Sequence, residues 1–544
     1  MKRKSKLALI FIISFFTFTL SGCIEKKEGI KFENRDYLVY NIEKIPKDLS
    51  MLDNNNIREK DLLFAIFEGL VKEDSKGNIL PAIADDWTIS KDGLSYKFKI
   101  REDAKWSNGN KITAEDFREF FQWILKEGKN NEYIKELKCI YGVSQYMNGR
   151  REFEDVAINA KEPNVLEIRL NNQCNYFLNI LSHPLLTLRE KNVFTDNYLG
   201  NYHRVKFTGP FTINNIKDDN NIKDEKEILL NKNKHYWEEE KVLSNRIDFI
   251  AVENQTDALI KFEKDNPSID LLVDPPKNEI NRLWEKEYIE LYPSFKTLNL
   301  VFNLKNSEVS GNINFRQSIK HSLSREIVSD IIDNKNTILT GSIIPSATSN
   351  ERGGDLGERD YSLFKPNITV ARDYLKKSNL NTKQQVITLI YKKDNTNKIL
   401  SENIKNELEQ ALDIKVNLEE YEESELNKKL EDGKFHMALL EFSGTFDNPI
   451  CFLNEWKIGS NSFYTGYENI NFDHYVNKAK NEQNHMRKIE YIRKGEELLL
   501  KDMPLIPFLN LKTAICKKNY VKGVEANKNG NLYFNYAYID REGS

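Results

Sequence analysis

The sequence of 544 residues contains no apolar run long enough to cross a membrane as a helix. The longest such run, Leu7 to Leu20, has 14 residues, whereas a transmembrane helix needs about 20. Four cations within the first six residues precede it, and small residues follow it. This order is typical of a secretory signal peptide, so we predict that residues 1–22 are removed during export.

Cysteine is scarce, and its positions lead to two predictions. Residues 20–23 read Leu-Ser-Gly-Cys, which looks like a lipobox, so we expect Cys23 to be lipidated and to become the mature N-terminus. Two acyl chains hold a protein firmly on a membrane, whereas a single acyl chain binds only marginally. Four other cysteines are widely scattered, without CxxC spacing: Cys139, Cys174, Cys451 and Cys516. In an exported protein they could form disulfides or stay as buried thiols, and their spacing leaves both possibilities open.

Short catalytic motifs are also missing. The sequence has no H-E-x-x-H, no G-x-S-x-G and no phosphate-binding G-x-x-x-x-G-K. Its seven histidines are isolated from one another, without the spacing of metal ligands. Removing the signal segment changes the net charge from −3 to −7, which is not typical of a nucleic-acid-binding protein. We therefore expect no catalytic residues, no metal site, no cofactor and no nucleic-acid partner.

The densest structural signals lie in residues 81–117. Residues 94–100 alternate between apolar and polar side chains, which predicts a strand with one exposed face. The Asp92-Gly93 pair before it indicates a hairpin turn. Thr113 and Asp116 have the spacing of a capping box at a helix N-terminus, so we expect a hairpin followed by a capped helix.

These residues also resemble the signature of the family-5 extracellular solute-binding proteins, the oligopeptide, dipeptide and nickel receptors of bacterial ABC importers. The order of Trp87, the Asp-Gly turn, Trp106-Ser-Asn-Gly109 and Thr113 carries the resemblance, and Thr208-Gly-Pro-Phe211 extends it. The resemblance implies an α/β, two-lobed periplasmic-binding-protein-like fold of class C, the large peptide-binding type, with an extra subdomain in the N-terminal lobe.

The C-terminal half has the pattern of a parallel sheet. Residues 386–391 predict a strand, residues 404–412 share an apolar helix face, and residues 414–418 alternate as a second strand. A strand, a helix and a strand with short links form a right-handed crossover. Residues 437–442 are largely apolar, as expected of a strand buried on both faces, and residues 472–500 are predicted to be helical.

The predicted binding site is the loop at residues 443–449, which follows that buried strand. In open α/β sheets, ligands lie beyond the carboxyl ends of strands. An exposed strand end could pair with an extended ligand as an added β-strand, and Gly444 would permit close approach of the backbone. The candidate ligand-binding residues here are Phe442, Ser443, Gly444, Thr445, Phe446 and Asp447.

The resemblance implies a negative charge at a position where this sequence has none. Peptide-binding members carry an aspartate four residues before the proline of this loop, and its carboxylate holds the ligand's α-ammonium group; here the position is Thr445. A hydroxyl group cannot supply that charge, and an ammonium group desolvated without a counter-charge is costly. Asp447 could take over or could merely cap the turn. Glu43, in an N-terminal loop that faces the cleft in family members, could be another cation partner or an ordinary solvated residue.

The resemblance also implies a division of the chain and a motion. In the family two strands cross between the lobes, here expected near residues 296–299 and 506–510, so that the lobes close on a ligand by a hinge. We predict a signal peptide at 1–22, a tether at 23–35, lobe I at 36–70, 200–295 and 509–544, its extra subdomain at 71–199, and lobe II at 296–508.

The predicted function is that of a lipid-anchored receptor on the extracytoplasmic face of the cell membrane. We expect a monomer that captures peptides and delivers them to the transmembrane subunits of an ABC permease with cytoplasmic ATPases. Because Thr445 replaces the acid, the alternatives are a receptor for an amine-blocked peptide, a nickel chelate or a saccharide, and a sensor of a peptide signal. An exported hydrolase on the same fold is a further class, which turnover of peptides would reveal.

Overall fold

The computed structural model describes residues 35–52, 56–194, 197–218, 226–264, 266–306, 308–328, 337–348, 366–381, 385–460 and 464–540. The predicted signal peptide, Cys23 and nearly all of the predicted tether lie outside these residues. Within them, no helix is both long and apolar enough to span a bilayer.

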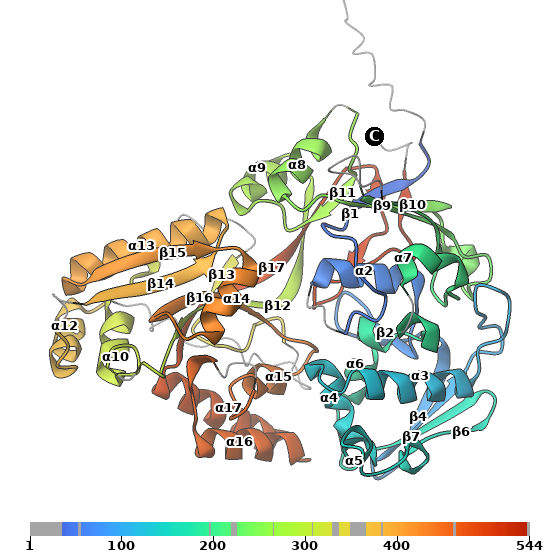
Figure 1. Cartoon of the computed structure of the whole chain (residues 1–544), viewed down its shortest axis with the longest axis horizontal. Coiled ribbons are helices and arrows are strands. Elements are labelled where there is room, and N and C mark those ends of the chain that lie inside the picture. Colours follow the sequence, from blue (N-terminus) through green and yellow to red (C-terminus); the bar gives the residue numbers. More distant parts are fainter. Residues whose placement is uncertain are drawn as a thin grey trace, which may run out of the picture.

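A mixed sheet of eleven strands organises the described residues (Figure 1). Its order is β15-β14-β16-β12-β17-β11-β1-β10-β9-β8, and β13 lies beside β17. The strands are β1 (Leu38–Asn41), β8 (Phe211–Asp218), β9 (Lys226–Lys232), β10 (Arg246–Ala251), β11 (Leu271–Val273), β12 (Ile289–Phe302), β13 (Thr337–Leu339), β14 (Val386–Lys392), β15 (Lys415–Tyr421), β16 (Met437–Ser443) and β17 (Leu505–Lys517). We call the side with β1, β8, β9, β10 and β11 the β1 half, and the side with β14, β15 and β16 the β14 half.

Strands β12 and β17 join the two halves. Residues 296–302 of β12 pair with β16, whereas residues 515–517 of β17 pair with β11. The register between β12 and β17 shifts between Tyr292 and Lys296, where Pro293 lacks the N–H that a ladder needs. Figure 1 shows the two strands running between two bodies of helices and strands. The expected two-lobed α/β architecture is confirmed, while the residue boundaries of the lobes stay a prediction.

The β14 half contains the predicted crossover. Strands β14 and β15 are parallel, with Val386 opposite Lys415, and α13 (Asn395–Leu412) connects them. Leu400, Ile404 and Leu408 of α13 are buried against the sheet in one apolar cluster. The other helices of this half are α10 (Ile313–Ser322), α12 (Ile368–Lys377), α14 (Glu423–Glu431) and α15 (Pro449–Asn454).

The predicted helical region at residues 472–500 is confirmed and consists of two helices. These are α16 (Ile470–Asn481) and α17 (His485–Asp502). Asn484 has an extended backbone, and its side chain accepts a hydrogen bond from the Arg487 N–H. An asparagine cap of this kind marks the start of a new helix.

A separate four-stranded sheet lies in the N-terminal half of the chain, in the order β4-β5-β7-β6. Its strands are β4 (Ala84–Ile89), β5 (Ser95–Ile100), β6 (Ile158–Glu162) and β7 (Val165–Arg169). The predicted hairpin is confirmed, with Gly93 at φ +67° between β4 and β5. The predicted capping box is confirmed as well, because Thr113 and Asp116 bond reciprocally at the start of α3 (Ala114–Glu127).

Short elements surround these two sheets. The remaining helices with α-helical hydrogen bonds are α2 (Ile57–Ile66), α4 (Glu132–Lys135), α5 (Val143–Met147), α6 (Phe177–Leu181), α7 (Tyr198–Asn201), α8 (Gln255–Glu263) and α9 (Ile280–Glu285). The remaining strands form two-stranded pairs: β2 (Val71–Glu73) with β3 (Ile79–Pro81), β18 (Val521–Lys522) with β21 (Tyr538–Ile539), and β19 (Glu525–Ala526) with β20 (Leu532–Tyr533).

Candidate functional site

The carboxyl end of β16 has an open edge. Strand β12 pairs with β16 along residues 437–443, but β14 pairs only with residues 437–439. On that second edge, residues 440–443 have no neighbouring strand in the part of the chain that the structure describes. Glu441 and Ser443 are exposed there. Main-chain groups at this edge are therefore available to an extended ligand.

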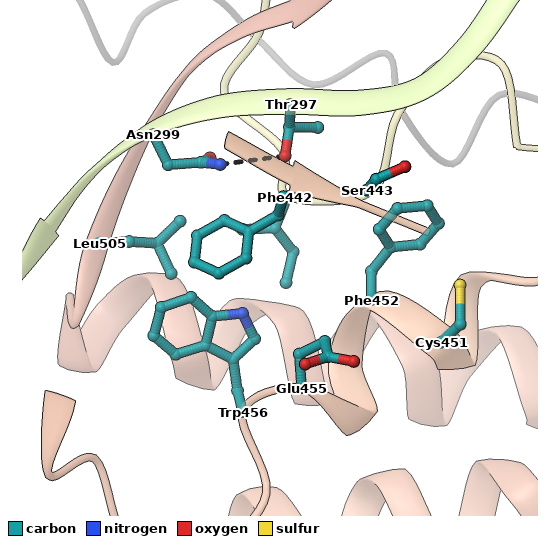
Figure 2. A pocket seen from close by; sticks show the side chains of 10 residues that line it. Thr297, Asn299, Phe442, Ser443, Cys451, Phe452, Glu455, Trp456 and Leu505 are labelled. Atoms are coloured by element: carbon teal, nitrogen blue, oxygen red, sulfur yellow. Dashed lines mark hydrogen bonds between the residues drawn. The ribbon is translucent and has the colours of Figure 1, made fainter. Parts of the chain in front are cut away.

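An aromatic pocket adjoins this strand end (Figure 2). The rings of Phe442 and Trp456 meet edge to face at 5.5 Å, and Phe452 forms another wall. The free space between the walls is about 10 Å³, room for about one water molecule. Its lining residues are Thr297, Asn299, Ile343, Phe442, Ser443, Cys451, Phe452, Glu455, Trp456 and Leu505.

Asn299 of β12 gives this pocket a polar wall. Its Nδ2 donates a hydrogen bond to Thr297 Oγ1 at 3.0 Å, as Figure 2 shows. Its Oδ1 is buried and has no hydrogen-bond partner among the described residues. A buried acceptor without a partner costs free energy. An N–H or O–H group at the pocket would therefore be stabilised by donating a hydrogen bond to this oxygen.

Packing explains Gly444 better than the approach of a ligand. The Gly444 N–H donates to Phe295 O at 3.2 Å, and the residue is buried. A Cβ atom added at Gly444 would lie 2.3 Å from Cζ of Phe452. The ring of Phe452 therefore takes the space that we had expected a ligand to need.

Phe446 packs against a segment from the N-terminal half of the chain. Its ring stacks face to face on that of Tyr176, with 4.9 Å between the ring centroids and 8° between the planes. Tyr176 precedes α6 and lies beside the four-stranded sheet, where Tyr96 contacts Phe177. The loop after β16 thus touches a segment about 270 residues earlier in the chain.

Asp447 forms a buried ion pair. Lys528 Nζ donates to Asp447 Oδ2 at 2.7 Å, and the two side chains are 9% and 3% exposed. The cap of α15 is Asn448, whose side chain accepts from the Ile450 N–H at 2.9 Å. Thr445 is half-buried, and its carbonyl accepts a hydrogen bond from Asn529 Nδ2 at 2.9 Å.

Glu43 is half-buried rather than an ordinary solvated residue. It has a left-handed backbone, with φ +68°, and its side chain accepts from Gln255 Nε2 at 2.6 Å. Burial raises the pKa of Glu43, and the positive charge of Arg58 opposes that rise. Sequence reasoning identified Glu43 as a candidate but gave it no partner.

A second group of charges near Glu43 was missed by the sequence analysis. Lys296, opposite Ser443 in the β12–β16 ladder, donates to Asp274 Oδ2 at 2.6 Å. Burial opposes the charge on both groups, yet the attraction between them raises the pKa of Lys296 and lowers that of Asp274. Both are therefore charged at neutral pH. The sequence around either residue does not predict this ion pair, because 22 residues separate its members.

Comparison with known proteins identifies the class. The bacterial extracellular solute-binding proteins of family 5 match residues 78–464 of this chain. The chain therefore belongs to this family, a family of solute-binding receptors, and the resemblance drawn from the sequence is confirmed.

Individual relatives match nearly the whole chain. The dipeptide-binding protein DppE of Bacillus subtilis is 26% identical over 96% of this chain and 97% of its own length. The oligopeptide-binding protein OppA of the same organism is 26% identical over 98% and 100%. Two solved structures share the fold. The murein tripeptide binding protein MppA of Escherichia coli has a TM-score of 0.79 at 18% identity, covering 93% of this chain and 99% of its own. Haemophilus influenzae OppA in complex with RPPGFSPFR has a TM-score of 0.78 at 18% identity, covering 94% and 100%.

Proposed function

We propose that this protein is the substrate-binding subunit of an ABC importer and that its ligand is a peptide. The observation that carries the proposal is the open edge of β16 at residues 440–443. An extended peptide would add to this edge as a further strand, with main-chain hydrogen bonds supplying affinity for many sequences. The aromatic side chains of Phe442, Phe452 and Trp456 lie beside this edge and would contact a ligand side chain. Relatives named as dipeptide- and oligopeptide-binding proteins support a ligand of this class.

Capture would occur by closure of the two halves about β12 and β17. Three contacts across the cleft support this: the Phe446–Tyr176 stack, the Asp447–Lys528 ion pair, and an ion pair between Glu136 and Lys480 at 3.5 Å. Closure would bury the peptide and present a combined surface of both halves to the transmembrane subunits of a permease. Cytoplasmic ATPases of that importer would supply the energy.

The proposed location is the extracytoplasmic face of the cell membrane. Lipidation at Cys23, after removal of residues 1–22, would anchor the protein there as a monomer, and the polar residues that follow would act as the tether. Labelling of cells with a radioactive fatty acid would test the anchor, since Cys23→Ser should abolish the label and release the protein.

Mass spectrometry of the molecules that co-purify with the protein tests the ligand class. Denaturing the purified protein should release short peptides of varied sequence in about one-to-one amount. A matched series of these peptides, with alternate backbone nitrogens methylated, should lose affinity by up to about tenfold for each hydrogen bond removed. Release of a saccharide or a metal chelate would contradict the proposal. Cleavage of the peptides by the pure protein would favour the hydrolase class.

A further inference from the structure

The ion pair between Asp447 and Lys528 connects the two halves of the molecule. Asp447 follows β16, and Lys528 lies in the turn between β19 and β20. That turn is fixed to the β1 half, because Asn531 Nδ2 donates to Asp61 Oδ1 at 3.0 Å, and Asp61 Oδ2 accepts from the Tyr40 hydroxyl at 2.6 Å. The chain itself therefore holds an ammonium group against the loop at residues 443–449.

The surroundings of this pair leave little space for a second cation. Gly77, in the turn between β2 and β3, has φ +89°, and a Cβ added there would lie 2.9 Å from both Asp447 Oδ2 and Lys528 Nζ. The ring of Phe295 lies 5.9 Å from the ammonium group on another side. Glu73 is another nearby carboxyl group, but it is only 4% exposed.

The turn that carries Lys528 also contacts Thr445, the position at which the family resemblance implies an acid in peptide-binding members. Asn529, the next residue, donates from Nδ2 to the carbonyl of Thr445 at 2.9 Å. The Lys528 carbonyl in turn accepts from the Phe295 N–H at 3.1 Å, which fixes the turn against β12. Two consecutive residues of the same turn thus hold the loop: Lys528 bonds to Asp447, and Asn529 bonds to Thr445.

We propose that Lys528 supplies the positive charge that neutralises Asp447 in this loop. The receptor therefore favours peptides that carry no charge in the segment facing the loop, above all peptides with a blocked amino end. This inference rests on the proposed peptide-binding function. A free α-ammonium group would bring a second cation beside a carboxylate that is already neutralised, and a buried, uncompensated cation is costly. An acylated nitrogen is neutral and needs only ordinary hydrogen bonds.

Equilibrium dialysis against two matched pools of random pentapeptides tests the proposal, one pool with free and one with acetylated amino ends. Mass spectrometry measures the bound fraction of each pool. The wild-type protein should bind the acetylated pool at least as well as the free-amine pool. Lys528→Met keeps the length of the side chain and removes its charge, so it should shift the preference toward the free-amine pool by tenfold or more. Adding Asp447→Asn to that variant should cancel the shift.

Two further variants serve as controls. Lys528→Arg keeps the charge and should bind as the wild type does. Lys522→Met removes an exposed lysine of the same C-terminal segment and should leave the preference unchanged. A wild-type preference of tenfold or more for the free-amine pool would overturn the proposal whether or not Lys528→Met folds. If the wild type bound neither pool, the peptide-binding function itself would fall, and this inference with it.

Discussion

At the scale of single residues, Glu73 carries the clearest dependence on pH. Its burial raises its pKa from 4.5 to about 7, Asp447 adds to the rise, and Lys528 opposes it. The folded protein therefore holds this proton more tightly than the unfolded chain does. The stabilising effect is complete below pH 4 and is lost as the pH rises through 7.

We predict that the free energy of unfolding falls by about 2 to 3 kcal/mol between pH 5 and pH 8 because of this one group. Glu73→Gln should remove that part of the pH dependence, as seen by urea denaturation at each pH. Glu119→Gln, at an exposed position of α3, is the matched control and should keep it. Equal pH profiles for Glu73→Gln and the wild type would show that Glu73 titrates normally.

Residues also show where local reasoning about the site ends. The sequence pointed to the loop because it follows a buried strand, and the family resemblance singled out Thr445 and Asp447 within it. It could not find Lys528, which lies 81 residues from Asp447. The pair forms only because the β19–β20 turn is packed against α2, and no local pattern encodes that packing.

At the scale of elements, two cysteines lie where separate segments meet. The thiols of Cys139 and Cys174 lie close enough to affect each other, and the neighbouring Cys174 thiol raises the pKa of Cys139. The backbone brings the segments together, because Cys139 O accepts from the Asn171 N–H at 2.8 Å, and Ile140 and Leu170 form an isolated bridge. In the structure the four described cysteines are free thiols, and Cys139 and Cys174 come from segments that lie side by side.

We predict that oxidised glutathione links Cys139 to Cys174, forming one disulfide while the glutathione disulfide is reduced to two thiols. Closing a loop of about 35 residues should stabilise the protein by about 4 kcal/mol in the chain-entropy account. Peptide mapping without reduction would identify the bond, and thermal denaturation would measure its effect. Cys139→Ser should abolish both, and Cys451→Ser should change neither. A link from Cys174 to Cys451 or Cys516 would contradict the prediction.

Elements with a strong local period were predicted from sequence, and their ends were less well predicted. Strand β5, the parallel pair β14 and β15, and the capped helix α3 follow from alternation, crossover length and a capping box. The helical region predicted at residues 472–500 consists of α16 and α17, and Asn484 caps the start of the second helix.

At the scale of the whole molecule, the ion pairs across the cleft differ in strength. Asp447 and Lys528 are nearly fully buried, whereas Glu136 and Lys480 are 20% and 39% exposed. Exposed pairs contribute about 0 to 1 kcal/mol, but breaking a buried pair costs about 3 to 5 kcal/mol because a charge is left uncompensated. The buried pair should therefore dominate the balance between open and closed forms.

We predict that Asp447→Asn shifts the ligand-free protein toward an open form, seen as a larger radius of gyration by small-angle X-ray scattering. The shift in the closing equilibrium should approach about 3 kcal/mol. Glu136→Gln is the matched control for an exposed pair and should change the scattering little. Equal scattering from both variants would mean that Lys528 does not hold the halves together.

The sequence by itself determined the class of the protein and most of its regular elements, because turn residues, alternation and the spacing of a family signature are properties of neighbouring positions. Only the tertiary structure decided which distant residues meet. Asp447 pairs with Lys528, Lys296 pairs with Asp274, and Phe446 stacks on Tyr176. These contacts depend on how two halves of a sheet are placed, and a change of a few ångströms in that placement would break them without altering any local pattern.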